Sequence, residues 1–476
     1  MARGRGELGR SAGSVLAVQS FDLIIVGTGS GNSIPAAFEG WNVALVEKDV
    51  FGGTCLNRGC IPSKMFIYAA DQAAGFAQAA KLGVHGTLDR VDWPAMVARV
   101  FGRIDSIAAG GEDYRSNRCP NITVFRGEGR FVDHKVIEVN GERITAPQIL
   151  LAAGARPHLP ENVAGLEQVA FHTSDTIMRV EALPERLIIL GGGYIGAELG
   201  HVFGSFGTKV DFVLRSSSML RECDDDVSHR ATQIYGERFG VHPNSRDLSV
   251  STGAGERGVV LRGTGPHGAF TLEADCLLVA TGRVPNADRL NVAASGIATD
   301  ASGHRVLSDE HLRTNVPGVW ALGDLTNEWQ LKHLANAEGR AVFHNIAQHN
   351  QPDQWRRIDR ALVPYAVFGH PQIAGVGLTE RAAHAAGLPY LVTSKDYGGT
   401  AYGWAMEDST SFCKLVAHRG TRQLLGAHII GPQASILIQP LLQGMRFGQT
   451  VDEMAHDVWY IHPALTEVVE NALLDL

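Results

Sequence analysis

Two cysteines with four residues between them form the most informative chemical segment of the chain, Gly53-Thr54-Cys55-Leu56-Asn57-Arg58-Gly59-Cys60-Ile61-Pro62-Ser63-Lys64. A thiolate is a good nucleophile, and two neighbouring thiols can store two electrons as a disulfide. Pro62 suits the first turn of a helix, and a helix start favours a thiolate nearby. The segment therefore predicts a redox-active pair, with a structural or zinc-binding pair as the alternative.

Zinc would need a second ligand pair at comparable spacing. The other cysteines are scattered singly, at Cys119, Cys223, Cys276 and Cys413. Their spacing does not favour a metal site, and the sequence indicates no metal ligands elsewhere.

Length and composition describe a globular protein of about three domains. The chain has 476 residues, 45% of them hydrophobic and 19% charged, which is enough for several buried cores. A net charge of -8 argues against a general nucleic-acid binder and against attraction to a membrane surface. Six cysteines in so long a chain do not make a disulfide scaffold, so we expect a reducing cytoplasm. No apolar run is long enough to span a membrane, and the Arg-, Gly- and Ser-rich residues 1–20 are expected to be a disordered tail.

Two segments have the pattern of a parallel βαβ unit. In the first, the apolar run 23–26 leads into glycines, a helical stretch and a second strand that ends at Glu47. In the second, the run 187–190 leads into a glycine-rich turn, a helix and a strand at 209–214. Three further segments are expected around these units: a helical stretch at 93–110, an antiparallel meander at 123–144, and strands at 276–282 and 318–324. From about Leu362 the pattern changes to a separate α+β domain.

The first glycine turn has the context of a dinucleotide-binding fingerprint. Gly27 and Gly29 follow a strand, where glycines allow a tight turn and close approach of a pyrophosphate to backbone N–H groups. Asn32 stands at the place of the third glycine, so we expect slightly looser packing between helix and strand there. Glu47 ends the next strand, where a carboxylate accepts hydrogen bonds from ribose hydroxyls; a solvated strand end is its alternative role.

The second glycine turn keeps all three glycines, Gly191, Gly193 and Gly196. Its second strand ends without an acid, and Arg215 and Arg221 follow instead. Two guanidinium groups can bind a 2′-phosphate in a bidentate manner. This unit is therefore predicted to prefer NADPH over NADH.

The cysteine segment, both fingerprints, and residues 280–286 and 321–324 together resemble the FAD-dependent pyridine nucleotide–disulfide oxidoreductases, from about Phe21 to the C-terminus. The resemblance implies an α/β fold with two Rossmann-like dinucleotide-binding domains, for FAD and NADPH, and a C-terminal α+β dimerisation domain. It implies an obligate homodimer. The domains expected are a tail at 1–20, an FAD-binding and central domain at 21–165 and 285–360, an NADPH-binding domain at 166–284 and a dimerisation domain at 361–476.

The resemblance also assigns roles to single residues. His462 and Glu467 resemble the catalytic dyad of the family, in which the histidine reaches the active site of the other subunit. Lys64 and Glu198 match positions beside the flavin, where a buried ion pair would tune hydride transfer. Tyr194 resembles the ring that covers the flavin; a packing aromatic is its alternative role.

The resemblance implies that Asp324 bonds the ribityl and phosphate region of FAD. The cofactor-binding residues expected in all are Gly27, Gly29, Ser30, Gly31, Glu47, Thr54, Cys55, Lys64, Asp324, Gly191, Gly193, Tyr194, Ile195, Gly196, Glu198, Arg215, Arg221 and Gly282.

As the resemblance implies, NADPH reduces FAD, and FAD reduces the Cys55–Cys60 disulfide. Cys55, expected to be the more exposed thiol, would attack a small-molecule disulfide, Cys60 would resolve the mixed disulfide, and His462 would protonate the departing thiolate. Residues 29–33, 331–333 and 462–474 resemble mycothione reductases, which reduce the disulfide of mycothiol. The alternative functions are a reductase of glutathione disulfide or another small disulfide, an NADPH-quinone reductase, and a non-catalytic flavoprotein subunit.

Overall fold

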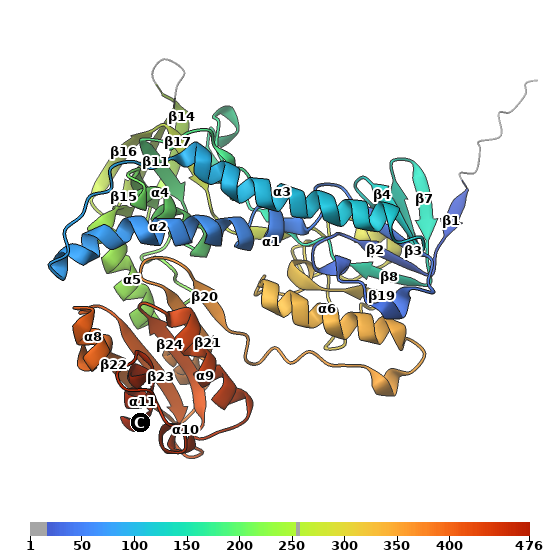
Figure 1. Ribbon diagram of the computed structural model, residues 1–476. Helices are drawn as coiled ribbons and strands as arrows, with labels where there is room; N and C mark the ends of the chain where they lie inside the picture. The colour runs from blue at the N-terminus through green and yellow to red at the C-terminus, as the bar shows by residue number, and fades with distance from the viewer. Residues whose placement is uncertain (1–16, 254–257) are drawn as a thin grey trace, which may run out of the picture.

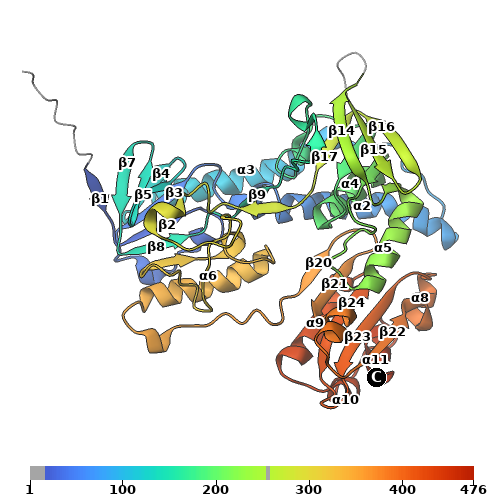
Figure 2. The same cartoon turned by 180° about the vertical axis from the view of Figure 1, so that it is seen from behind.

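Two parallel sheets and one antiparallel sheet organise the molecule (Figure 1; Figure 2). The computed structural model describes residues 17–253 and 258–476. This architecture confirms the fold class predicted from the sequence. None of the helices within residues 17–253 and 258–476 combines the length and the hydropathy that a membrane-spanning segment needs.

The first parallel sheet has the strand order β19-β8-β2-β3-β4. The strands are β2 (Leu23–Val26), β3 (Val43–Glu47), β4 (Ile122–Arg126), β8 (Gln148–Leu151) and β19 (Val319–Ala321). Every residue of β2 and β3 is buried, as expected for apolar strands covered on both faces. On one face they pack against α6 (Lys332–Ala347), and on the other against a small second sheet. That second sheet, of order β1-β7-β6-β5, consists of β1 (Val18–Ser20), β5 (Arg130–Asp133), β6 (Val136–Val139) and β7 (Glu142–Thr145).

The structure corrects two expectations about these strands. The antiparallel meander comprises only β5, β6 and β7, because β4 pairs in parallel with β3 as the edge strand of the first sheet. The N-terminal stretch is not wholly a tail, because Val18 pairs with Arg143 where β1 joins β7. Residues 1–16 of that predicted tail lie outside the described residues.

The segment after the first glycine turn also differs from its prediction. Instead of one helix, the chain forms the short 3-10 turns η1 (Ser30–Asn32) and η2 (Ala36–Phe38) before β3. Pro35 lies between them, and proline cannot donate the hydrogen bond that a continuing helix needs.

Two long helices connect the first parallel sheet with the second parallel sheet, which is described below. α2 (Cys60–Lys81) and α3 (Trp93–Asn117) lie side by side in both views. Pro62 stands in the first turn of α2, as predicted, and α2 contacts α4 (Tyr194–Ser205) of the second unit. The aromatic side chains of Phe66, Trp93 and Phe203 bring the three helices into one core.

The second parallel sheet has the order β13-β12-β11-β17. Its strands are β11 (Arg186–Leu190), β12 (Lys209–Val213), β13 (Gly240–His242) and β17 (Cys276–Val279), with α5 (Asp225–Arg238) between β12 and β13. A four-stranded sheet beside it contains β10 (Val163–Ala164), β14 (Arg246–Thr252), β15 (Val259–Gly265) and β16 (Gly268–Ala274). The pair β9 (Ala155–Pro157) and β18 (Arg283–Pro285) joins the two parallel units.

The C-terminal sheet is antiparallel, of order β20-β21-β24-β23-β22. Its strands are β20 (Tyr365–Val367), β21 (Ile373–Gly377), β22 (Tyr390–Asp396), β23 (Phe412–His418) and β24 (Leu424–Ile430). Its helices are α7 (Glu380–Ala385), α8 (Ala401–Ala405), α9 (Ala434–Arg446), α10 (Val451–His456) and α11 (Thr466–Leu474). α9 and α11 bury their apolar faces on this sheet.

A buried lysine joins the C-terminal sheet to the second parallel unit. Lys414 on β23 is 3% exposed, and its Nζ lies 2.9 Å from Asp224 Oδ1, 2.6 Å from Asp226 Oδ2 and 2.7 Å from Glu380 Oε2. Asp224 caps α5 and is 1% exposed. Burial alone would raise the pKa of Asp224, but hydrogen bonds from Lys414 and from the Glu380 N–H hold it below its ordinary value.

We predict that Lys414→Met lowers the midpoint of thermal unfolding by roughly 6 °C or more, since an unpaired buried carboxylate costs about 3–5 kcal/mol. Scanning calorimetry of the protein would measure the change. Arg422→Met is the matched control, because Arg422 pairs with Asp452 at the surface. It should leave the midpoint almost unchanged. Equal effects of the two substitutions would contradict a special role for the buried network.

Candidate redox site

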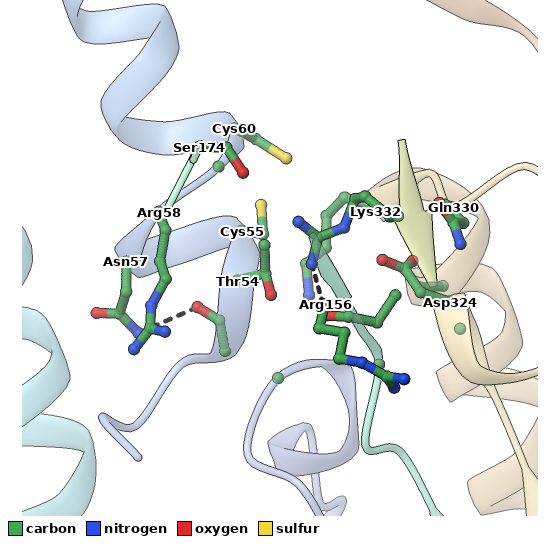
Figure 3. A pocket seen from close by; sticks show the side chains of 18 of the residues that line it. Thr54, Cys55, Asn57, Arg58, Cys60, Arg156, Ser174, Asp324, Gln330 and Lys332 are labelled. Carbon is green, nitrogen blue, oxygen red and sulfur yellow. Dashed lines mark hydrogen bonds between the residues drawn. The ribbon is translucent and has the colours of Figure 1, made fainter. Parts of the chain in front are cut away.

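A cleft of about 2000 Å³ lies where the first sheet, the start of α2 and the start of α4 meet. Its lining includes Cys55, Cys60, Lys64 and Glu198, together with the first glycine turn. Figure 3 shows the two cysteines facing a group of polar side chains across the cleft. The predicted site residues that line it are Gly27, Gly29, Ser30, Glu47, Thr54, Cys55, Cys60, Lys64, Tyr194, Ile195, Glu198 and Asp324.

The two cysteines are free thiols whose sulfur atoms face each other (Figure 3). Cys55 lies in α1 (Gly53–Asn57), and Cys60 is the first residue of α2. A hydrogen bond from the Cys55 thiol, together with the nearby Lys64 ammonium, lowers the pKa of Cys60 to about 7. The same hydrogen bond, together with burial, raises the pKa of Cys55. In the dithiol form, the negative charge is therefore on Cys60, and Cys55 keeps its proton.

The structure reverses the expected order of exposure. Cys60 is exposed and Cys55 is half-buried, whereas the sequence led us to expect Cys55 to be the more exposed thiol. The reason is local: Cys60 begins a helix at the wall of the cleft, whereas Cys55 lies inside the short helix α1.

Lys64 and Glu198 form the predicted ion pair although they are far apart in sequence. Lys64 Nζ lies 2.8 Å from Glu198 Oε1 and 2.6 Å from Oε2, and the Glu198 side chain is 5% exposed. The backbone N–H of Phe368 donates a third hydrogen bond to Glu198 Oε1, at 3.0 Å. Lys64 is one helical turn after Cys60, so this pair fixes the start of α2.

The first glycine turn packs more closely than the sequence suggested. Gly27 has φ 106°, and a Cβ there would lie 2.4 Å from the carbonyl oxygen of Ala152. A Cβ on Gly31 would lie 2.7 Å from the Cβ of Ala152. The chain therefore packs tightly at Gly31, although we expected looser packing because Asn32 replaces the third glycine. Asn32 instead accepts a hydrogen bond from Arg115 Nε of α3, at 2.8 Å.

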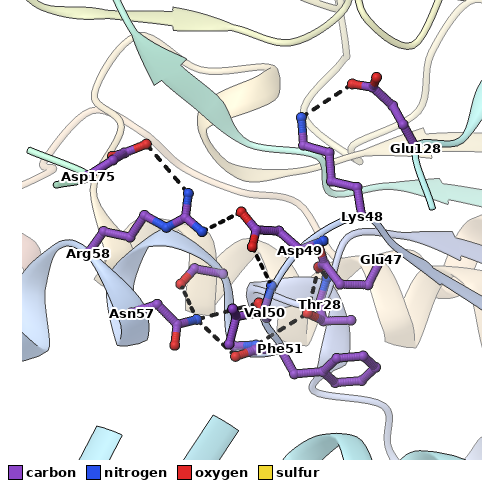
Figure 4. Close-up of polar contacts among 12 residues, drawn as sticks. Thr28, Glu47, Lys48, Asp49, Val50, Phe51, Asn57, Arg58, Glu128 and Asp175 are labelled. Atoms are coloured by element: carbon purple, nitrogen blue, oxygen red, sulfur yellow. Dashed lines mark hydrogen bonds and ion pairs between the residues drawn. The ribbon is translucent and has the colours of Figure 1, made fainter. Parts of the chain in front are cut away.

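Glu47 is anchored by the same turn (Figure 4). Its Oε2 accepts hydrogen bonds from the N–H of Thr28 at 2.9 Å and from Thr28 Oγ1 at 2.6 Å. Its Oε1 accepts one from the N–H of Asp49 at 2.8 Å. Glu47 is 9% exposed and lines the cleft, so it is not a solvated strand end.

Sequence reasoning missed the residues that brace the cysteine loop. Arg58 forms ion pairs with Asp49 and with Asp175, the latter at 3.7 Å (Figure 4). Asn57 Nδ2 donates to the carbonyl oxygens of Phe51 at 2.9 Å and of Gly53 at 3.0 Å. Both residues stand between the two cysteines, which is the signal that could have identified them.

Asp324 faces the cleft from the 3-10 turn η7 (Gly323–Leu325), where burial raises its pKa (Figure 3). Glu338 on α6 holds this turn. Glu338 Oε2 accepts a hydrogen bond from the N–H of Gly323 at 2.7 Å, and its Oε1 accepts one from Arg360 at 2.8 Å. The Glu338 side chain is fully buried. It lies in mid-helix without a motif around it, and no signal in the sequence identified it.

Tyr194 is the first residue of α4 and lines the cleft, 43% exposed. Although the residue as a whole is partly exposed, its hydroxyl group is desolvated, and this raises the pKa of Tyr194 to about 12. The phenol therefore keeps its proton at neutral pH.

The second glycine turn repeats the geometry of the first. A Cβ on Gly191 would lie 2.4 Å from the carbonyl oxygen of Ala280, and one on Gly196 would lie 2.6 Å from that of Gly191. Arg215 and Arg221 follow β12 on the surface, where Arg221 Nε lies 2.9 Å from Glu222 Oε1. The predicted residues outside the cleft are Gly31, Gly191, Gly193, Gly196, Arg215, Arg221 and Gly282.

His462 and Glu467 form the predicted pair, but at a distance from the cleft. Glu467 lies in the first turn of α11, and its Oε1 is 2.7 Å from Nδ1 of His462, which precedes the helix. The histidine side chain is 73% exposed and is not among the residues that line the cleft. Within one chain, the structure thus assembles the pair without bringing it to the cysteines.

The cleft fits a flavin dinucleotide. Gly27 and Gly29 present backbone without side chains to a pyrophosphate, and the carboxylates of Glu47 and Asp324 and the two cysteines line the same cleft. This arrangement can connect a bound nucleotide to a disulfide.

Comparisons with known proteins agree with this geometry. Residues 21–339 match the family model for pyridine nucleotide-disulphide oxidoreductase, and residues 363–473 match the dimerisation domain of that family. The chain is 48% identical to mycothione reductase of Mycobacterium tuberculosis over 96% of its length and all of the relative. It is 33% identical to dihydrolipoyl dehydrogenase of Chlamydia muridarum, over 96% of this chain and 97% of that one.

A solved structure is similar over nearly the whole molecule. The HOCl-induced flavoprotein disulfide reductase RclA from Escherichia coli is 26% identical, with a TM-score of 0.81. The match covers 95% of this chain and 99% of that one.

We predict that alkylation of Cys60 by iodoacetamide in the reduced protein has a pH midpoint near 7, because the thiolate reacts and the thiol does not. Cys55→Ala removes the hydrogen-bond donor and should move the midpoint upward. Cys55→Ser keeps a hydroxyl donor and should move it less. Peptide mass spectrometry over a pH series measures each midpoint. An unchanged midpoint in Cys55→Ala would show that Cys55 does not stabilise the thiolate.

Proposed function

The chain belongs to the pyridine nucleotide–disulphide oxidoreductase family, and we propose that it is an NADPH-dependent reductase of mycothione. The observation that carries the proposal is the thiol pair, with a Cys60 thiolate beside the Lys64–Glu198 ion pair, in the lining of a dinucleotide-sized cleft. The 48% identity to a mycothione reductase over the whole relative supports the substrate. The dithiol argues against a non-catalytic subunit.

Membership of this family implies FAD and a nicotinamide nucleotide as cofactors. When bound, FAD supplies the two-electron link between the nicotinamide and the cysteine pair. The residues proposed to hold FAD are the predicted ones that line the cleft, namely Gly27, Gly29, Ser30, Glu47, Thr54, Cys55, Lys64 and Asp324. For the nicotinamide nucleotide we propose the second glycine turn, with exposed Arg215 and Arg221 on the 2′-phosphate of NADPH.

The distribution of protons in the pair calls for a base. Cys55 keeps its proton because it donates to the Cys60 thiolate, so Cys55 cannot attack a disulfide until that proton is removed. We propose that His462 of the partner subunit takes this proton and then gives it to the first departing thiolate of the substrate. Cys60 then attacks the sulfur of Cys55, which releases the second thiolate and restores the enzyme disulfide.

The position of the dyad supports a homodimer in this proposal. His462 is exposed next to Trp459 and Ile461, which are 95% and 75% exposed, on the segment that matches the dimerisation domain. Glu467 orients the histidine ring and stabilises its charged form. We also propose the domain division expected from the sequence: an FAD-binding and central domain at 21–165 and 285–360, an NADPH-binding domain at 166–284 and a dimerisation domain at 361–476. The proposed location is the cytoplasm.

We predict that NADPH-dependent turnover of mycothione exceeds that of glutathione disulfide and lipoamide by at least about tenfold in kcat/KM. Steady-state assays of the holoenzyme with the three disulfides in parallel would measure this, and repeating them with NADH tests the coenzyme. Preferred turnover of glutathione disulfide would overturn the substrate and leave the disulfide reductase class intact. A preference for NADH would overturn the role of the two arginines.

We predict that Cys60→Ala and His462→Ala homodimers both lose nearly all disulfide reduction, whereas a heterodimer of the two variants regains one working site. Co-expression with two different affinity tags would isolate the heterodimer, whose activity should approach half that of the unchanged dimer. Glu470→Ala, another residue of α11, is the matched control for His462→Ala. A heterodimer as inactive as its parents would show that the dyad serves its own chain.

A further inference from the structure

Three potential metal ligands meet behind the redox site. They come from three separate segments: Asp71 on α2, His201 on α4, and His370 in the loop between β20 and β21. Their ligand atoms all lie within 4.8 Å of one another. Because the three segments are far apart in sequence, no spacing motif pointed to this cluster.

The geometry of the cluster is that of a prepared site. His201 Nε2 lies 2.8 Å from Asp71 Oδ1, and the rings of His201 and His370 stack with centroids 5.5 Å apart. The His201 side chain is fully buried, while Asp71 and His370 are half-buried. An ion could therefore enter from the side of Asp71 and His370 and be largely shielded from water once bound.

Neighbouring residues orient both rings. His201 Nδ1 lies 3.0 Å from Ser205 Oγ, which leaves Nε2 directed at Asp71. His370 Nε2 lies 2.7 Å from the side-chain amide of Gln78. A neutral imidazole offers one nitrogen lone pair, and a metal ion would take up these lone pairs in place of the present hydrogen bonds at the two rings.

We propose that Asp71, His201 and His370 bind a first-row transition-metal ion of the Zn²⁺ class. Two imidazole nitrogens and one carboxylate oxygen are a ligand set that zinc accepts, with water or the Gln78 amide oxygen in the fourth position. The carboxylate supplies the negative charge. The guanidinium of Arg238 is the nearby opposing charge, and it contacts the carbonyl oxygen of His370 at 3.1 Å and Ser205 Oγ at 3.3 Å, not the ligand atoms.

The site would clamp the segments that build the redox centre. Asp71 is two turns of α2 after Lys64, His201 is one turn of α4 after Glu198, and His370 is two residues after Phe368. Lys64, Glu198 and Phe368 are joined by hydrogen bonds of their own. A bound ion would thus add a second fixed point to the same three segments and stabilise their arrangement.

Isothermal titration of the oxidised holoenzyme with zinc chloride tests the proposal, because the disulfide form keeps the cysteine pair from competing for zinc. We expect one zinc ion per chain, and an affinity at least about tenfold weaker in Asp71→Asn and in His370→Ala. The midpoint of thermal unfolding should rise with zinc in the unchanged enzyme and not in these variants. Cobalt in place of zinc should give the visible bands of a tetrahedral nitrogen and oxygen site without thiolate bands.

Two controls make the result decisive. His242→Gln alters a comparable histidine–aspartate pair, in which His242 Nε2 lies 3.0 Å from Asp211 Oδ1, and should leave zinc binding unchanged. The double variant Cys55→Ser with Cys60→Ser should also keep the site. No zinc bound to the unchanged oxidised enzyme, unchanged affinity in both Asp71→Asn and His370→Ala, or binding lost only with the cysteines would each overturn the proposal.

Discussion

The redox centre depends on one buried carboxylate, Glu198. A buried charge is costly unless it is paired, and Glu198 draws its partners from two other segments, Lys64 on α2 and the backbone of Phe368 in the loop between β20 and β21. Satisfying this one group therefore forces the helix that carries Cys60, the helix of the second nucleotide unit and the C-terminal part of the chain to meet at one point. The apolar core that joins α2, α3 and α4 supports the three helices on the side away from the cleft that the pair lines.

The two glycine turns show one backbone solution used twice. In each, a glycine approaches the carbonyl oxygen of the residue that follows the neighbouring strand so closely that a Cβ would lie 2.4 Å from it. The turns then differ: the second opens directly into α4, whereas Pro35 breaks the first into short 3-10 turns. Gly31 and Arg115 secure the first turn without a long helix, since Gly31 packs on Ala152 and Arg115 binds Asn32.

The sequence predicted features in which local pattern and chemistry coincide. The buried parallel strands, the start of α2 at the second cysteine, the Lys64–Glu198 pair and the His462–Glu467 pair are all present in the structure. What it did not predict depends on contacts between distant segments. β4 belongs to the parallel sheet because it pairs with β3, which is distant in sequence. Glu338 holds η7 because this turn lies against α6. The exposure of the two thiols follows from how α1 and α2 meet the cleft, which a residue pattern does not encode.

The hydrogen bond between the two thiols also bears on damage by oxidants. Peroxides attack thiolates first, so at neutral pH they would convert Cys60 to a sulfenic acid. The Cys55 thiol already lies within hydrogen-bonding reach of that sulfur, and its condensation with the sulfenic acid would release water and form a disulfide. That product is the oxidised form through which the proposed catalytic cycle already passes. Without such a neighbour, a sulfenic acid can be oxidised further to an irreversible sulfinic or sulfonic acid; here it would stop at a disulfide that the next turnover reduces.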